Sequence, residues 1–171
     1  MINIGSLTLD KQDGIYASYK DPKVMQPREP SEARQAVDAW LAGDYERARE
    51  LYSVCVAKAA LPGAGLGPNF YLSEWARHEA SIGNREAFER LFAKVFASEP
   101  DAPFWRLCYA RDTWTELKDE VACHDRIGTL EALLASDRWN RTLDLAPRAY
   151  AQKIATLKAW LRGEPGGPIW P

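Results

Sequence analysis

The most unusual charged segment of the chain runs from Asp112 to Asp125, where five carboxylates stand against a single lysine. Asp112, Glu116 and Glu120 follow one another at intervals of four, so they share one face if a helix continues through the segment. Such a face is either an ordinary solvated helix surface or a patch that attracts a basic partner. Trp114 lies beside it and is an expected interface anchor. The residues expected to contact a partner are Asp112, Trp114, Glu116, Asp119, Glu120 and Asp125.

The two histidines do not form a recognisable catalytic or zinc-binding motif. Arg77-His78-Glu79 resembles the start of a zinc-protease motif, but Ile82 stands where the second histidine belongs. Glu74 and His78 are four residues apart, and we interpret them as an ordinary pair on a helix surface. Cys123 and His124 are adjacent and therefore point about 100° apart on a helix, which prevents a direct side-chain hydrogen bond.

The glycine-rich segment 63–67 also lacks the surroundings that phosphate binding requires. It has the sequence Gly-Ala-Gly-Leu-Gly, it follows a predicted helix, and no Lys-Ser/Thr pair comes after it. The serines occur in no nucleophile-elbow pattern. The sequence therefore predicts no catalytic site, no metal and no cofactor, and an enzyme with an unrecognised site is the least favoured alternative.

These side chains are carried by a chain with the periodicity of amphipathic helices from Ser31 onward. Glycine followed by a capping residue marks two inter-helix turns, at Gly43-Asp44 and Gly83-Asn84. The expected helices begin at Ser31, Asp44, Asn69 and Asn84 and after Pro103. A sixth includes Val121, Ile127, Leu130 and Leu134, and the last runs from Pro147 to Gly163 after a loop at 137–146. The predicted fold class is mainly α.

The first thirty residues have a different pattern. Two β-prone runs around Asp13-Gly14 predict a short N-terminal β-hairpin, and prolines at 22, 27 and 30 predict an extended connector. Residues 164–171 are rich in proline and glycine and are expected to form an extended tail. We interpret residues 1–171 as one domain with helical repeats over 31–163.

The two glycine turns are related by an internal repeat. A shift of 40 residues superimposes Gly43 on Gly83 and brings apolar or small residues onto the same helix face. Gly43-Asp44-Tyr45-Glu46-Arg47-Ala48 followed by Tyr52, and Gly83-Asn84 followed by Phe92 and Pro100, resemble the turn and second helix of a tetratricopeptide repeat. The resemblance covers about residues 31–100. It implies stacked antiparallel helical hairpins that bind proteins, often on a concave face.

Composition narrows the class of partner and compartment. The net charge of −2 lacks the basic excess that nucleic-acid binders need. No signal peptide is visible, and no apolar stretch is long enough to cross a membrane. Three scattered cysteines do not suggest a disulfide scaffold, so we expect a cytoplasmic protein.

The expected function is protein binding without catalysis. The favoured interpretation is an inhibitor or immunity-type protein that neutralises a bacterial toxin or effector, whose basic domain would contact the acidic residues. The alternative is a tetratricopeptide-like adaptor or secretion chaperone that holds a peptide in its concave face. A toxin gene directly upstream would favour the first interpretation, and neighbouring secretion or envelope genes would favour the second.

Overall fold

In the computed structural model, residues 31–139 and 146–165 are described, and they form seven helices and no strand. The helices are α2 (Glu32–Leu41), α3 (Tyr45–Ala59), α4 (Pro68–Ser81), α5 (Arg85–Ser98), α6 (Pro103–Thr115), α7 (Glu120–Ala135) and α8 (Pro147–Leu161). The prediction of a mainly α fold is confirmed. The predicted N-terminal β-hairpin and most of the predicted tail lie outside the described residues.

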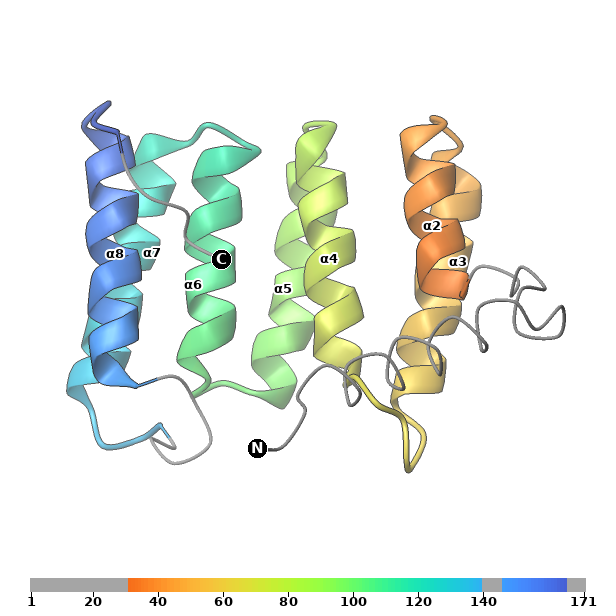
Figure 1. The fold of residues 1–171 in the computed structure, drawn as a ribbon, viewed down its shortest axis with the longest axis horizontal. Coiled ribbons are helices and arrows are strands. Elements are labelled where there is room, and N and C mark those ends of the chain that lie inside the picture. Colours follow the sequence, from red (N-terminus) through yellow and green to blue (C-terminus); the bar gives the residue numbers. More distant parts are fainter. Residues whose placement is uncertain (1–30, 140–145, 166–171) are drawn as a thin grey trace, which may run out of the picture. The chain divides into compact units, whose positions relative to one another are not determined.

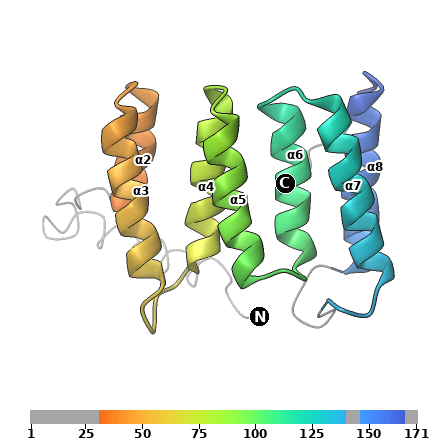
Figure 2. The ribbon, with the colours of Figure 1, turned by 180° about the vertical axis from the view of Figure 1, so that it is seen from behind.

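The helices from α2 to α8 belong to one compact unit, Glu32–Pro171. The helices α2, α4, α6 and α8 face the viewer in Figure 1, and we call them the front layer. The helices α3, α5 and α7 face the viewer in Figure 2 and form the rear layer. Contacts are most extensive between α2 and α3, between α4 and α5, and between α6 and α7, and further contacts join α3 to α4 and α4 to α6.

Buried apolar side chains join the helices in three clusters. The first holds α2 to α3 through Ala36, Leu51 and Tyr52. The second joins α4, α5 and α6 and is built largely from Phe88, Phe92 and Leu72. The third joins α6, α7 and α8 around residues that include Leu107, Ile127, Leu130, Tyr150 and Leu157. Complete burial of such side chains contributes about 1.5–3 kcal/mol each, which makes these contacts the main source of stability.

Both predicted glycine turns are confirmed. Gly43 and Gly83 have φ angles of 81° and 77°, the left-handed conformation that favours glycine after a helix. Asp44 Oδ1 then accepts a hydrogen bond from the Arg47 amide at 3.2 Å. Asn84 Oδ1 accepts one from the Ala87 amide at 3.3 Å, so both residues cap the helix that follows.

One local prediction is wrong. Asn69 does not cap α4, which begins at Pro68; it is buried and donates to Ser98 Oγ at 2.8 Å on α5. Proline at the first helical position already supplies a favourable start, because its missing N–H would have no intrahelical partner. The sixth predicted helix corresponds to α7, in whose first turn Val121 is 75% exposed.

Candidate functional site

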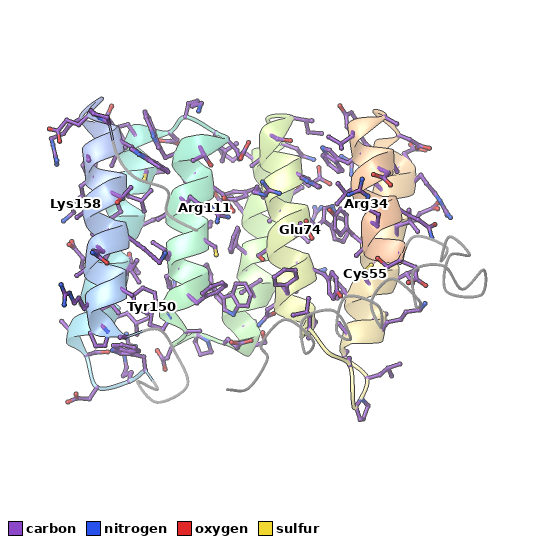
Figure 3. All side chains as sticks on the ribbon, viewed as in Figure 1. Arg34, Cys55, Glu74, Arg111, Tyr150 and Lys158 are labelled. Atoms are coloured by element: carbon purple, nitrogen blue, oxygen red, sulfur yellow. The ribbon has the colours of Figure 1, made fainter. Side chains whose placement is uncertain are left out.

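A groove lies between α4 and α6, two neighbouring helices of the front layer. Its volume is about 300 Å³. The α4 wall is formed by Phe70, Ser73, Glu74 and Arg77, and the α6 wall by Phe104, Trp105, Cys108 and Arg111. Figure 3 labels Glu74 and Arg111, one on each wall. Because both walls run in the same direction, the aromatic side chains lie toward the start of the two helices and the arginines toward their ends.

Two opposite charges on the α4 wall make no direct hydrogen bond or ion pair with a described residue. Glu74 and Arg77 are half-buried, and neither makes a hydrogen bond or ion pair with any residue in those ranges. Burial raises the pKa of Glu74, and the nearby positive charge of Arg77 only partly offsets this effect. A half-buried charge without a partner is unfavourable, so both groups are suited to pair with a ligand that enters the groove.

The opposite wall is held by a buried ion pair. Arg111 Nε donates to Asp112 Oδ1 at 2.7 Å, and the Asp112 side chain is only 1% exposed. The other oxygen of this carboxylate, Oδ2, has no hydrogen-bond partner among the described residues. Burial raises the pKa of Asp112, although the hydrogen bond from Arg111 opposes the shift. Asp112 therefore lies behind the groove wall and positions Arg111.

The aromatic end of the groove is partly open. Phe70 is 42% exposed, and the Trp105 indole is half-buried and donates from Nε1 to Glu99 Oε2 at 3.0 Å. The ring of Phe104 meets that of Trp105 edge to face, with their centroids 4.7 Å apart. Aromatic side chains held in this way offer a large apolar contact area at little cost in conformational entropy.

The α4 wall rests on a network of polar contacts with α3. Glu79 is 1% exposed and accepts two hydrogen bonds from the Arg49 guanidinium at 2.7 and 2.8 Å. Trp75 Nε1 and Asn84 Nδ2 donate to the same carboxylate at 2.9 and 2.8 Å. Burial opposes ionisation of Glu79, but these hydrogen bonds outweigh it and hold its pKa below the ordinary value. The network fixes the rotation of α4 and thus the direction of its groove-lining residues.

His78 is part of the packing between α4 and the first two helices. Its Nδ1 lies 2.8 Å from the Tyr52 hydroxyl, and its ring stacks on Trp40 with centroids 5.2 Å apart. Burial lowers the pKa of His78 to about 4, and Arg77 adds to the shift. The interpretation of Glu74 and His78 as a surface pair is wrong, because no hydrogen bond or ion pair joins them and His78 contacts α2 and α3 instead.

The predicted acidic face is not a single helix face. The helix α6 ends at Thr115, and α7 begins at Glu120. Between them the chain turns at Lys118, which has a φ angle of 55°. Asp112 is fully buried, so the expected alignment of Asp112, Glu116 and Glu120 on one exposed surface is wrong. The physical reason is that the chain turns between α6 and α7 within this segment, so the acidic residues belong to two helices and the turn between them.

The other predicted partner-binding residues remain near this turn in different states. Asp119 caps α7 through the Ala122 amide at 2.9 Å and pairs with Arg85 at 2.7 Å. Trp114 is half-buried and packs on the apolar cluster of α6, α7 and α8, and its role as an interface anchor stays a prediction. Glu120 and Asp125 are exposed, and Glu116 is half-buried.

Comparisons with known proteins add no functional evidence. No family model, curated protein or solved structure matches the chain. Within the described ranges, no group of three or more His, Cys, Asp or Glu residues is arranged to hold a metal ion. The helices in the same ranges include none with the length and apolar character of a membrane span.

The sequence reasoning missed the groove, although one signal was present. Glu74 and Arg77 are spaced by three and so share a helix face. On α6, Phe104, Cys108 and Arg111 have the same spacing as Phe70, Glu74 and Arg77 on α4, with Cys108 in place of Glu74. The periodicity alone did not reveal that α4 and α6 are neighbours, because α5 separates them along the chain.

Proposed function

We propose that this chain is a non-catalytic protein-binding module that receives a segment of its partner in the groove between α4 and α6. The observation that carries the proposal is that Glu74 and Arg77 make no hydrogen bond or ion pair with a described residue and lie beside the partly open aromatic end of the groove. Binding sites combine apolar contact area with a small number of polar groups that set orientation. The groove has both elements, and its volume of about 300 Å³ suits one or two partner side chains better than a large cofactor.

A tetratricopeptide-like arrangement of helical hairpins is part of this proposal. Phe104 and Arg111 on α6 follow Phe70 and Arg77 on α4 at a spacing of about 34 residues, the length of that repeat. The 40-residue shift between the first two glycine turns is longer because the loop between α3 and α4 is inserted there. In such an arrangement, the first helices of successive hairpins line the surface that binds the partner.

Two biological roles fit this class. A toxin inhibitor or immunity-type protein would cover a functional surface of its target, and the exposed acidic residues Glu120 and Asp125 favour a basic target. An adaptor or secretion chaperone would use the groove alone to hold a peptide. Either role would suit a reducing compartment such as the cytoplasm, because all three cysteines are free and buried. The genes beside this one discriminate between the two roles.

A peptide library displayed on phage tests the proposal even while the partner is unidentified. The library is selected in parallel on the natural protein, on Ser73→Trp, which fills the groove, and on Ser53→Trp, a control at an exposed site on α3. We expect peptides that bind the natural protein and Ser53→Trp but not Ser73→Trp. Equal enrichment on all three proteins, or none on any of them, would overturn the proposal, provided circular dichroism shows both variants to be folded.

A further inference from the structure

We infer that the groove between α4 and α6 selects an extended partner segment with a basic residue followed two positions later by an acidic residue, and with an aromatic residue directly before the basic one. The basic side chain would pair with Glu74 and the acidic side chain with Arg77. The aromatic side chain would lie against Phe104 and Trp105 on the opposite wall. This inference rests on the proposed function, and it names the chemistry of the partner.

Glu74 and Arg77 attract each other, but the charge of Arg77 only partly offsets the burial of Glu74. Glu74 and Arg77 are three residues apart on α4 and line the same groove, yet they form no ion pair. Neither is engaged by any other described residue through a hydrogen bond or ion pair. A ligand with a single charge would satisfy one of these groups and leave the other half-buried without a partner. A segment with both charges satisfies both groups and matches the groove in sign at each position.

Spacing then favours an extended segment. Residues three apart on a helix have Cβ atoms about 5–6 Å apart. Residues i and i+2 of an extended chain lie on the same face and are about 6.6–6.8 Å apart. The long side chains of Glu74 and Arg77 span the small difference. The alternate residues of such a segment face the other wall, so the residue before the basic one points toward α6.

Opposite Glu74 and Arg77, the α6 wall can accept an apolar group but not a second pair of charges. Cys108 stands on α6 where Glu74 stands on α4, and the Cys108 thiol is buried with its pKa raised by burial, so the wall is uncharged there. Arg111 is engaged by Asp112 at 2.7 Å. Phe104 and Trp105, one turn earlier, supply the aromatic surface. The groove is therefore polarised, with charge recognition on α4 and apolar contact on α6.

A charge-swap experiment tests this inference. The probes are three acetylated and amidated peptides flanked by Gly-Ser: Trp-Lys-Ala-Asp, the reversed Trp-Asp-Ala-Lys, and the uncharged Trp-Gln-Ala-Asn. Binding is followed by nuclear magnetic resonance titration of the full chain at low salt. For the natural protein we expect Trp-Lys-Ala-Asp to bind about tenfold more tightly than either control, the effect of one or more charge-assisted contacts. The double variant Glu74→Arg, Arg77→Glu should instead prefer the reversed peptide.

The outcomes separate this inference from the proposed function. An unchanged preference in the folded double variant, or equal affinity for all three peptides, overturns the charge pattern. If the library still yields groove-dependent peptides with another pattern, the proposed function stands and only this inference fails. If the library yields none and no probe shifts the resonances of groove residues, both fail. A variant that loses its native spectrum is replaced by Glu74→Gln, for which the preference for the charged peptide should fall about tenfold.

Discussion

Replacement of Arg49 by methionine is the sharpest test of how α4 is held in place. The substitution keeps a long apolar side chain but removes both hydrogen bonds to Glu79, at 2.7 and 2.8 Å. Each bond to a charged group contributes about 1.5–3 kcal/mol when its loss leaves a buried group unsatisfied. Arg49 is 36% exposed, so water can replace part of the loss. We therefore expect the free energy of unfolding to fall by about 2–3 kcal/mol at neutral pH.

The pH dependence of this loss has a definite sign. The pKa of folded Glu79 lies below its ordinary value of 4.5, so the network stabilises the fold above that pH. The stabilisation disappears as the pH falls through the lower pKa of the folded state, because protons then bind the carboxylate in both states. The difference in free energy of unfolding between the natural protein and Arg49→Met should accordingly become smaller as the pH falls below about 4.5.

Urea denaturation followed by circular dichroism measures both effects. Arg47→Met is the matched control, because its ion pair with Glu50 is 55% and 68% exposed and should contribute no more than about 0.5 kcal/mol. A loss for Arg49→Met as small as that of the control would refute the reasoning. A difference that stays constant down to pH 3 would show that Glu79 is not the group responsible.

Three further predictions concern the core, a turn and the acidic surface. His78 has a folded pKa of about 4 against an ordinary value of 6.5, so the unfolded chain binds a proton at a higher pH than the folded chain does. The free energy of unfolding should therefore decline as the pH falls from 6.5 to 4, and denaturation curves of His78→Gln should show a smaller decline. Gly43→Val should lower the free energy of unfolding by about 1–2 kcal/mol through left-handed backbone strain alone, because a Cβ at this position meets no atom within 4 Å. In thermal denaturation, the control Gly65→Val should lose far less stability. Glu120→Lys with Asp125→Lys should slow association with a basic target and weaken its salt dependence, and an unchanged association rate in surface plasmon resonance would count against the inhibitor role.

The turn between α6 and α7 shows why the sequence misled us about the acidic residues. The helices α2, α4 and α8 are each followed by a glycine at the left-handed position, with Gly43, Gly83 and Gly163 at φ angles of 81°, 77° and 71°. The turn between α6 and α7 has Lys118 in this conformation, at 55°. Without a glycine to mark the break, the four-residue spacing of the acidic residues looked like one continuous helix. The local residue preferences do not predict this turn, because a lysine rarely adopts the left-handed conformation.

The sequence likewise did not reveal which charged side chains are buried. Asp112 looked like a surface carboxylate, but it lies on the core side of α6 and pairs with Arg111. Glu79 looked like part of a failed zinc motif, but it receives four hydrogen bonds from three side chains. The identity of a polar residue does not reveal whether distant segments bring it a partner. That depends on which helices become neighbours.

The sequence by itself determined the helical class, the two glycine turns with their caps, the proline starts of α6 and α8, and most of the apolar core. These features depend on backbone conformations and periodicities that a few adjacent residues control. Only the tertiary structure decided that α4 and α6 face each other, that Glu74 and Arg77 make no direct hydrogen bond or ion pair with a described residue, and that Asp112 is buried. The physical reason is that the groove is made by helices that are not consecutive, so its charges and its aromatic end meet through packing and not through spacing along the chain.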